Sequence, residues 1–313
     1  MIYCIFITND GTRPHFETIN FIKMKGNFKM AKENYISLRG QLRSDVRIIC
    51  DNDGEPVTAL FPLLVVRRNK YDRAGNISPK FDRPIIATSD PEMIAAASKL
   101  QKHNIVEVKG TFRTQHSFRK KQCEHCGKIN VIESAIQTIN PSYIGVLNTS
   151  FTNDTDGAKY LMEQAEISNI AKILGYVCTP TDEIITSEAE HGGYYTRYQL
   201  AVNRKLYIID SEDEEDHTDY PMVYSYGKTA EEDALVLQQG ALVYLDGFLR
   251  TTEMEQPIEC CECGEEFIIK ERRMSLSPYS MEYLRGYRDD VLESTHTTEL
   301  PEQDMSLLES DQD

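Results

Sequence analysis

The sequence lacks the features that would carry it into or across a membrane. No apolar run approaches the roughly 18 residues that a membrane-spanning helix needs. The opening residues, MIYCIFITNDG, contain a short apolar stretch but neither a basic start nor a small-residue cleavage site, so they do not indicate a signal peptide. We therefore expect a cytoplasmic protein without a membrane partner.

Catalytic signatures are also missing. The sequence contains no nucleophile–base motif, no glycine loop of the kind that cradles phosphates and no histidine-rich metal cluster. An enzyme that acts on nucleic acid is thus the least favoured interpretation. We expect a binding protein that is not an enzyme.

Positive charge is scarce overall, with a net charge of −16, but the scarcity is confined to one half of the chain. Residues 31–150 hold 18 Lys and Arg against 12 Asp and Glu, whereas residues 151–313 hold 12 against 36. Such asymmetry indicates a half that faces nucleic acid and an acidic half. The alternative is that the acidic residues only keep the second half soluble.

The most informative feature that is present is an internal duplication. The segment VEVKGTFRTQHSFRKKQCEHCG, at residues 106–127, recurs as VYLDGFLRTTEMEQPIECCECG at residues 243–264. The shared valine, glycine and cysteine positions are each 137 residues apart. A constant offset over this length indicates two copies of one structural unit.

Each copy has the element order of an OB-fold, a five-stranded barrel with a helix between its third and fourth strands. Alternating apolar residues predict the strands, and a helix is expected over residues 89–104. Ser89 and Glu92 have the spacing of a capping box, as do Thr229 and Glu232 in the second copy. We expect a mainly β protein with two tandem OB-fold barrels, each with one short helix and a Cys-x-x-Cys-Gly hairpin.

The expected domain organisation has four segments. Residues 1–29 form an N-terminal extension, residues 30–150 a basic OB-fold, residues 160–286 an acidic OB-fold and residues 287–313 a disordered acidic tail. The clean start MAKENYISLRG at Met30 suggests the hypothesis that Met30 is the true initiator. The upstream segment would then be a gene-calling artefact or a disordered arm.

Three segments resemble the bacterial single-stranded DNA-binding protein family. They are NYISLRGQLRSD, the strand VEVKGTFRT with the helix before it, and YQLAVNRK in the second copy. The resemblance covers residues 31–140 and, more faintly, 166–280. It implies OB-folds that coat single strands, often as homo-oligomers, with an acidic tail that recruits replication or transfer proteins. The tandem layout is similar to a pseudo-dimeric relative from a mobile element such as a plasmid or phage.

The sequence departs from that family in three respects. It has no tryptophan, whereas the family's base-stacking residues include tryptophans, and typical members have no cysteine knuckles. Its end, SLLESDQD, lacks the family's terminal Pro-Phe, so recruitment through the tail does not follow from the resemblance.

Candidate nucleic-acid-binding residues follow the second and fourth strands of the first copy. Single-strand binding needs positive charge for the phosphates and flat rings for the bases. The candidates are Arg67, Arg68, Lys70, Tyr71, Arg73, Arg113, His116, Phe118, Arg119, Lys120 and Lys121. We expect binding of single-stranded DNA with little sequence specificity, in replication, repair or transfer of DNA. The alternatives are a solvated hairpin whose charges only aid solubility, or a protein-interaction module on the duplicated scaffold.

Two aromatic residues near these candidates are expected to lie in the core. Phe112 shares strand parity with Val106 and Val108, and Phe61 lies within an apolar strand. A bulge at Gly110 would shift that parity.

The equivalent arm of the second copy, residues 250–255, is acidic and would repel phosphates. We therefore expect the second copy to support the first, to pair with another protein or to add little DNA affinity. Its remaining candidates for DNA contact are Arg204, Tyr207, Tyr198 and Phe248.

The two Cys-x-x-Cys-Gly knuckles are typical zinc half-sites. The simplest arrangement places Cys123, Cys126, Cys260 and Cys263 around one structural zinc that joins the copies, and it requires the two hairpin tips to meet. The alternatives are a zinc shared between subunits, completion by His116 or His125, or vestigial pairs. A redox pair is the minor interpretation because no thioredoxin-like βαβ unit surrounds the cysteines.

Overall fold

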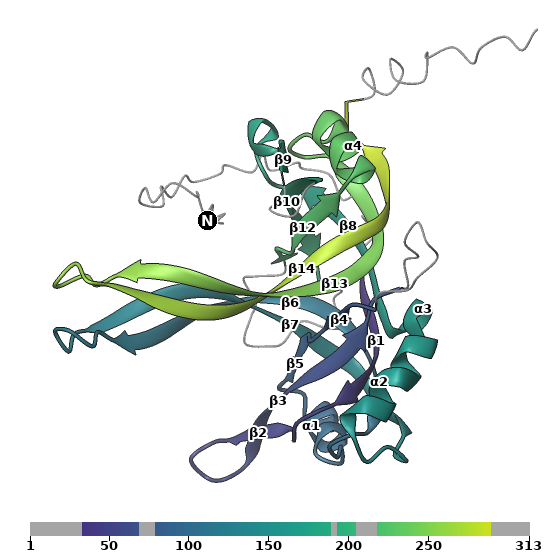
Figure 1. Cartoon of the computed structure of the whole chain (residues 1–313), viewed down its shortest axis with the longest axis vertical. Helices are drawn as coiled ribbons and strands as arrows, with labels where there is room; N and C mark the ends of the chain where they lie inside the picture. The colour runs from purple at the N-terminus through teal and green to yellow at the C-terminus, as the bar shows by residue number, and fades with distance from the viewer. Residues whose placement is uncertain (1–32, 69–78, 189–192, 205–217, 289–313) are drawn as a thin grey trace, which may run out of the picture. The chain divides into compact units, whose positions relative to one another are not determined.

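The computed structural model describes residues 33–68, 79–188, 193–204 and 218–288 (Figure 1). These residues belong to one compact unit, Lys32–Asp313. The expected N-terminal extension, the acidic tail beyond residue 288 and most of the acidic loop at residues 210–219 lie outside the described residues. In the part of the chain that is described, no helix combines the length and apolar character that a bilayer crossing requires.

The first copy is a closed barrel. Its elements are β1 (Asn34–Leu42), β2 (Arg47–Cys50), β3 (Pro56–Val66), β4 (Phe81–Asp82), β5 (Ile85–Thr88), α1 (Pro91–Ala97), β6 (Ile105–Gln122) and β7 (Ile129–Asn148). β1 pairs with β3 and β6, β3 pairs with β5, and β6 pairs with β7. A parallel contact between β5 and β7 at Ile86 and Ile139 closes the ring of five strands, which is the order that the sequence predicts.

The second copy repeats this ring. Its elements are β8 (Asn169–Val177), β9 (Thr186–Glu188), β10 (Tyr194–Asn203), β11 (Thr218–Asp219), β12 (Met222–Tyr226), α4 (Lys228–Val236), β13 (Leu242–Glu259) and β14 (Glu266–Arg285), with a 3₁₀ turn at Thr181–Glu183. β8 pairs with β10 and β13, β10 with β12, and β13 with β14. The parallel closure joins Val223 to Leu276, and each lies 137 positions after its counterpart in the first copy.

The two barrels share one sheet. β1 pairs antiparallel with β8, so the described strands form a single 14-stranded sheet. The pairing is centred on Ile36 opposite Ala171, with Asn34 opposite Ile173 at one end and Leu38 opposite Asn169 at the other. Because the equivalent asparagines lie at opposite ends of the pairing, the copies are related by an approximate twofold axis.

The hydrophobic core includes side chains from both barrels in one cluster. Phe61 and Phe112 are fully buried, which confirms the prediction that they belong to the core. The register does shift between Lys109 and Gly110, but the unpaired residue, Ser142, is on β7. The parity of β6 is therefore unchanged.

An asparagine near the start of each copy fixes β1 or β8 against the base of its hairpin. The Asn34 side chain accepts a hydrogen bond from the Phe112 amide at 2.8 Å and donates one to the Phe112 carbonyl at 2.9 Å. Asn169 makes the same pair with Leu249, at 3.0 and 2.8 Å. Both asparagines are buried, so each satisfies a backbone amide and carbonyl that water does not reach.

A buried carboxylate of the first copy, Asp82, also accepts a hydrogen bond from the second copy. Asp82 is paired with the Arg67 guanidinium through two hydrogen bonds of 2.5 and 2.8 Å. The same carboxylate accepts a hydrogen bond from the Thr251 amide at 2.7 Å, and the Thr251 hydroxyl accepts one from the Arg83 amide at 2.9 Å. One charged pair thus joins β3, β4 and the base of β13.

The reciprocal bridge has the same construction. Asp219 is paired with Arg204 through hydrogen bonds of 3.0 and 2.9 Å. It accepts a hydrogen bond from the Thr114 amide at 2.8 Å, and the Thr114 hydroxyl accepts one from the Tyr220 amide at 3.2 Å. All these residues lie 137 positions from their counterparts, so the same type of bridge joins the barrels at two equivalent places.

The helices differ from the predicted ones in two ways. α1 is shorter than expected and is capped by Asp90 rather than Ser89, because Pro91 occupies the first helical position and sets the cap one residue before it. α4 begins after Gly227 and has no side-chain cap, so the predicted Thr229–Glu232 box does not form.

The linker between the copies contains two helices that the sequence analysis did not predict. They are α2 (Asp154–Glu163) and α3 (Ala165–Ser168). Leu161 and Ala165 pack against β3 and β6 in a small cluster with Leu64, Val66 and Ile105. The linker is therefore bound to the first barrel rather than free of it.

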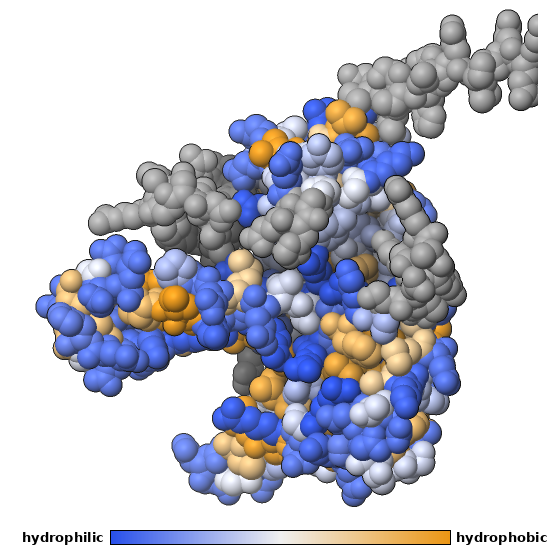
Figure 2. All heavy atoms as spheres, in the orientation of Figure 1, coloured by the Kyte–Doolittle hydropathy of each residue, from blue (hydrophilic) through white to orange (hydrophobic). Residues whose placement is uncertain are grey.

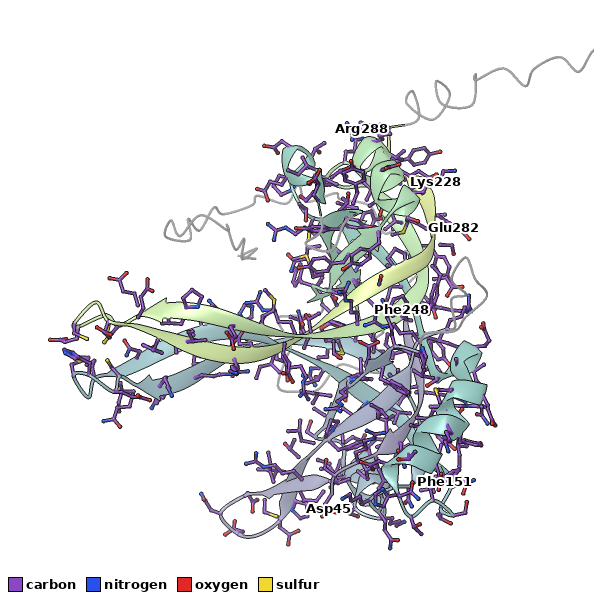
Figure 3. The ribbon with its side chains drawn as sticks, viewed as in Figure 1. Asp45, Phe151, Lys228, Phe248, Glu282 and Arg288 are labelled. Carbon is purple, nitrogen blue, oxygen red and sulfur yellow. The ribbon has the colours of Figure 1, made fainter. Side chains whose placement is uncertain are left out.

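Replacing Asp82 by Asn should lower the free energy of unfolding by about 3 kcal/mol, because it leaves the Arg67 guanidinium without a compensating charge in a largely buried site. The matched control is Asp45→Asn, since Asp45 is exposed (labelled in Figure 3). Urea denaturation of both variants measures the difference. Equal stability of the two variants would contradict the bridging role.

Candidate nucleic-acid interface and cysteine cluster

Each copy extends a long antiparallel hairpin beyond its barrel (Figure 1). The first hairpin comprises residues 113–138 of β6 and β7, and the second hairpin comprises residues 250–275 of β13 and β14. Directly opposed residues of antiparallel strands point to the same face. The strand register therefore assigns each side chain of the hairpins to one of two faces.

One face of the first hairpin carries basic and aromatic side chains. His116, Phe118 and Lys120 alternate along β6 and lie opposite Ala135, Glu133 and Val131. The Phe118 ring is 67% exposed, although aromatic rings usually lie in cores. Within the described residues, the Lys120 ammonium has no ion-pair partner. His116 lies 3.4 Å from the Glu133 carboxylate. This basic–aromatic face therefore combines an exposed flat ring with an unpaired Lys120 ammonium and one carboxylate that contacts His116.

The opposite face of the first hairpin contacts the second hairpin. Arg119 lies 3.6 Å from the Glu271 carboxylate, and Ile132, directly opposite Arg119, is buried. Glu271 is buried. The charge of Arg119 is therefore partly compensated inside the protein, whereas the neighbouring Lys121 is exposed and has no ion-pair partner among the described residues.

The arginines after the second strand are engaged at the seam between the copies. Arg67 is paired with Asp82, and its guanidinium lies 5.1 Å from the centre of the ring of Phe248. Phe248 is labelled in Figure 3. Arg68 makes an ion pair of 2.7 Å with Glu166 and lies over the Tyr279 ring. Both cations are thus part of contacts between the copies or with the linker. Lys70, Tyr71 and Arg73 lie outside the described residues.

The remaining candidate of the first copy, Arg113, lies at the base of the first hairpin. Arg113 is half-buried near Asp219. Burial raises the pKa of Asp219, against hydrogen bonds and charge from Arg204 and a smaller effect of Arg113.

The second-copy candidates that the structure describes are mainly internal. Tyr198 is buried and donates a hydrogen bond of 2.9 Å to Asp233, while Arg204 is buried against Asp219. Phe248 is only 8% exposed. Tyr207 lies outside the described residues.

The second hairpin is less repulsive than its β13 sequence suggests. Glu253 makes an ion pair of 2.8 Å with Arg272, and Glu255 makes one of 3.1 Å with Lys270. These cations come from β14, directly across the hairpin. An expectation based on residues 250–255 alone overlooked them, because the pairing partner lies about 20 positions further along the chain.

The tips of the two hairpins meet at the four knuckle cysteines. The sulfurs of Cys123, Cys126, Cys260 and Cys263 all lie within 4.8 Å of one another. The Cys123 and Cys263 sulfurs are 3.8 Å apart, and those of Cys126 and Cys260 are 3.6 Å apart. Four sulfurs at about 2.3 Å from a tetrahedral zinc would be separated by about 3.8 Å. The cluster therefore has the spacing of a four-thiolate metal site, and the tips meet as the inter-copy arrangement requires.

The local backbone supports this geometry. Gly127 and Gly264 follow the knuckles with φ values of 74° and 73°, a conformation that glycine adopts without steric cost. The backbone amides of Cys263 and Glu262 donate hydrogen bonds to the Cys260 sulfur and lower the pKa of that thiol to about 6. Against hydrogen bonds from the backbone, burial and the neighbouring sulfurs raise the pKa of Cys126 and Cys263. The turn of the second knuckle therefore favours the metal-binding thiolate form at Cys260.

Asn130 connects the knuckles, and the sequence analysis did not identify it. Its side-chain oxygen accepts a hydrogen bond of 3.0 Å from the Cys261 amide, and its nitrogen lies 3.6 Å from the Cys260 sulfur. Asn130 is buried. The duplication could not reveal this role, because the equivalent residue of the second copy is Phe267.

Comparison with known proteins bears on the fold and the family. Residues 173–266 match the model of the single-strand binding protein family. No curated protein matches the sequence. A deletion mutant of the single-stranded DNA binding protein from Thermus aquaticus aligns with a TM-score of 0.53 and 15% identity, covering 82% of this chain and 97% of that one. The wild-type Thermus aquaticus protein aligns with a TM-score of 0.51 and 14% identity, covering 82% and 96%.

These matches confirm the predicted mainly β, OB-fold class. Over residues 173–266 the second copy is similar to the single-strand binding protein family. At 14–15% identity the structural matches show a shared fold. The family match falls on the second copy, although the sequence resemblance is fainter there than in the first copy.

A variant with Cys126 and Cys260 as the only knuckle thiols should form a disulfide between the hairpins when the metal-free protein is oxidised with diamide. The two sulfurs are 3.6 Å apart, so a small movement brings them to a bonding distance of about 2.05 Å. Peptide mapping identifies the link. The additional change Cys126→Ser is the control and should abolish it. Only intermolecular links in the first variant would contradict the contact between tips.

Proposed function

We propose that the protein is a non-enzymatic single-stranded DNA-binding protein with little sequence specificity. The observation that carries this proposal is the exposed basic–aromatic face of the first hairpin, where Phe118 and Lys120 are neighbours on an OB-fold arm. A ring can stack on any base and an ammonium can neutralise any phosphate, so neither contact selects a sequence. On the opposite face of the same hairpin, Arg119 contacts Glu271 and the exposed Lys121 adds positive charge near the tip.

A structural zinc bound by the four knuckle cysteines forms the second part of the proposal. Cys123, Cys126, Cys260 and Cys263 would hold the ion, and the zinc would supply bonds that join the hairpin tips. An isolated two-stranded hairpin is only marginally stable in water. The site would therefore keep the basic–aromatic face extended and ordered.

The proposed biological setting is replication, repair or transfer of DNA in the cytoplasm, in some cases on a mobile element. Support comes from the relationship of the second copy to the single-strand binding protein family. The acidic C-terminal segment would recruit protein partners, and further copies of the chain would assemble along the strand.

An interaction module is the second candidate function. The observation that favours it is the exposure of apolar side chains on the hairpins, with Ile129, Val131 and Ile268 each more than half exposed. Figure 2 shows hydrophobic residues on the hairpins within a mostly hydrophilic surface. This candidate gains support if the purified protein retains no oligonucleotide but captures a protein partner through the hairpins.

The variant Lys120→Glu/Lys121→Glu should bind labelled oligo-dT at least about tenfold more weakly, since two phosphate contacts become repulsive. The slope of log Kd against log salt should fall by about 1.4 for the two lost contacts. Fluorescence anisotropy over a salt series measures both quantities. The matched control is Lys99→Glu/Lys102→Glu, which changes the same charge at exposed positions after α1. Equal weakening by both variants would refute a localised face.

Purified protein should contain about one zinc per chain, measured by mass spectrometry of the metal. The variant Cys123→Ser/Cys263→Ser should lose the metal, whereas the exposed Cys50→Ser should retain it. Because the core cluster of the barrels does not include the knuckles, the barrels should stay folded while the amides of the hairpins exchange faster. Unchanged hairpin exchange in the metal-free variant would exclude a stabilising role.

A further inference from the structure

An open depression lies where the base of the second hairpin meets β4 of the first barrel. Its volume is about 250 Å³. Phe81 and Arg83 line it from the first copy, and Thr251, Thr252, Glu253 and Arg272 line it from the second. The depression is distinct from the basic–aromatic face, since none of its residues belongs to the first hairpin.

The walls of the depression are held in place before any ligand binds. Asp82 lies between Phe81 and Arg83 in the sequence and accepts the hydrogen bond from the Thr251 amide, and the Thr251 hydroxyl accepts one from the Arg83 amide. These bonds attach the segment around β4 to the base of β13. A site built on such fixed backbone loses little entropy when a ligand is bound.

The lining has an excess of positive charge. Two guanidinium groups, Arg83 and Arg272, accompany a single carboxylate, Glu253. The hydrogen bond from Arg272 lowers the pKa of Glu253, and Arg83 lowers it further through its charge. The carboxylate is therefore ionised at neutral pH and compensates only one of the two cations.

The lining also offers an aromatic surface. Phe81 is 37% exposed although it belongs to a strand that pairs with β3. An exposed ring beside an uncompensated guanidinium group is the combination that receives a base and its phosphate. The Thr252 hydroxyl adds a hydrogen-bonding group to the lining, whereas the Thr251 hydroxyl is already engaged with the Arg83 amide and the Asp82 carboxylate.

The duplication shows that this site is particular to one side of the molecule. The residues 137 positions away, in lining order, are Thr218, Tyr220, Thr114, Gln115, His116 and Ala135. Neither arginine has a basic counterpart, and Phe81 is replaced by threonine. The framework of bridges is symmetric, so the difference lies in the lining alone.

We infer that this depression binds one nucleotide of a DNA single strand, with its phosphate between Arg83 and Arg272 and its base against Phe81. The inference rests on the proposed function and extends it, because it gives the second hairpin a direct part in DNA binding. The net charge of the second half does not oppose this, since a phosphate senses the charges within about 10 Å.

Two substitutions separate the two contacts. In the full-length protein, Arg83→Gln should weaken binding to labelled oligo-dT by about three- to tenfold and reduce the salt slope by about 0.7. Phe81→Ala should weaken it by at least about fivefold while the salt slope stays unchanged. Lys99→Gln, the same loss of charge at an exposed site, is the control for Arg83→Gln. Melting temperatures verify that each variant is folded.

A third substitution acts in the opposite direction. Glu253→Gln should tighten binding by about two- to threefold, because it removes the only carboxylate of the lining. Glu255→Gln is its matched control, since Glu255 is the next residue on the same face and is also paired across the hairpin. An equal effect of the two changes would show a general charge effect and overturn the site.

The outcomes distinguish this inference from the proposed function. If Lys120→Glu/Lys121→Glu weakens binding but Arg83→Gln and Phe81→Ala do not, the depression is refuted and the basic–aromatic face stands. If all of these variants weaken binding as expected, both proposals are supported. If the wild-type protein does not bind oligo-dT at low salt, both are overturned.

Discussion

Two buried Arg–Asp pairs determine how the barrels are joined. Asp82 and Asp219 each compensate an arginine of their own copy and also accept the amide of a threonine at the base of the other copy's hairpin. A buried carboxylate needs both a counter-charge and hydrogen-bond donors, so neither barrel can satisfy its own aspartate without the other. These bridges hold the base of each hairpin against the opposite barrel. The wall of the Arg83 depression includes one of them.

Much of the fold could be predicted from the sequence, because the duplication shows the sequence pattern of each element twice. Burial of Phe61 and Phe112 follows from strand parity, and the meeting of the knuckles is one of the arrangements that two Cys-x-x-Cys half-sites allow. The pairing of β1 with β8 could not be predicted, since neither strand indicates which partner it meets beyond its own barrel. The α2 helix was recognisable in principle, because Asn153 and Asp156 have the spacing of an N-terminal cap.

The candidate site shows a different limit of prediction. Composition identifies basic and aromatic residues, but it does not reveal which charges are already compensated. Arg67 and Lys120 are equally basic in sequence, yet one is paired with a buried aspartate and the other projects from an exposed face. Likewise the acidity of β13 is offset by cations of β14. Such differences depend on cross-strand register and on contacts between the copies, and neither can be deduced from the sequence alone.

The helical linker has a consequence for how the molecule can change over time. In a homodimer each substitution occurs at two symmetric places, so a useful change on one side must be tolerated on the other. Here α2 and α3 connect the two copies in one chain and pack on the first barrel. The association of the copies therefore does not depend on the protein concentration. One half can therefore acquire an arginine, an asparagine or a phenylalanine that its counterpart does not share. Because the two copies belong to one chain, equivalent positions of the symmetric framework can carry different residues and different functions.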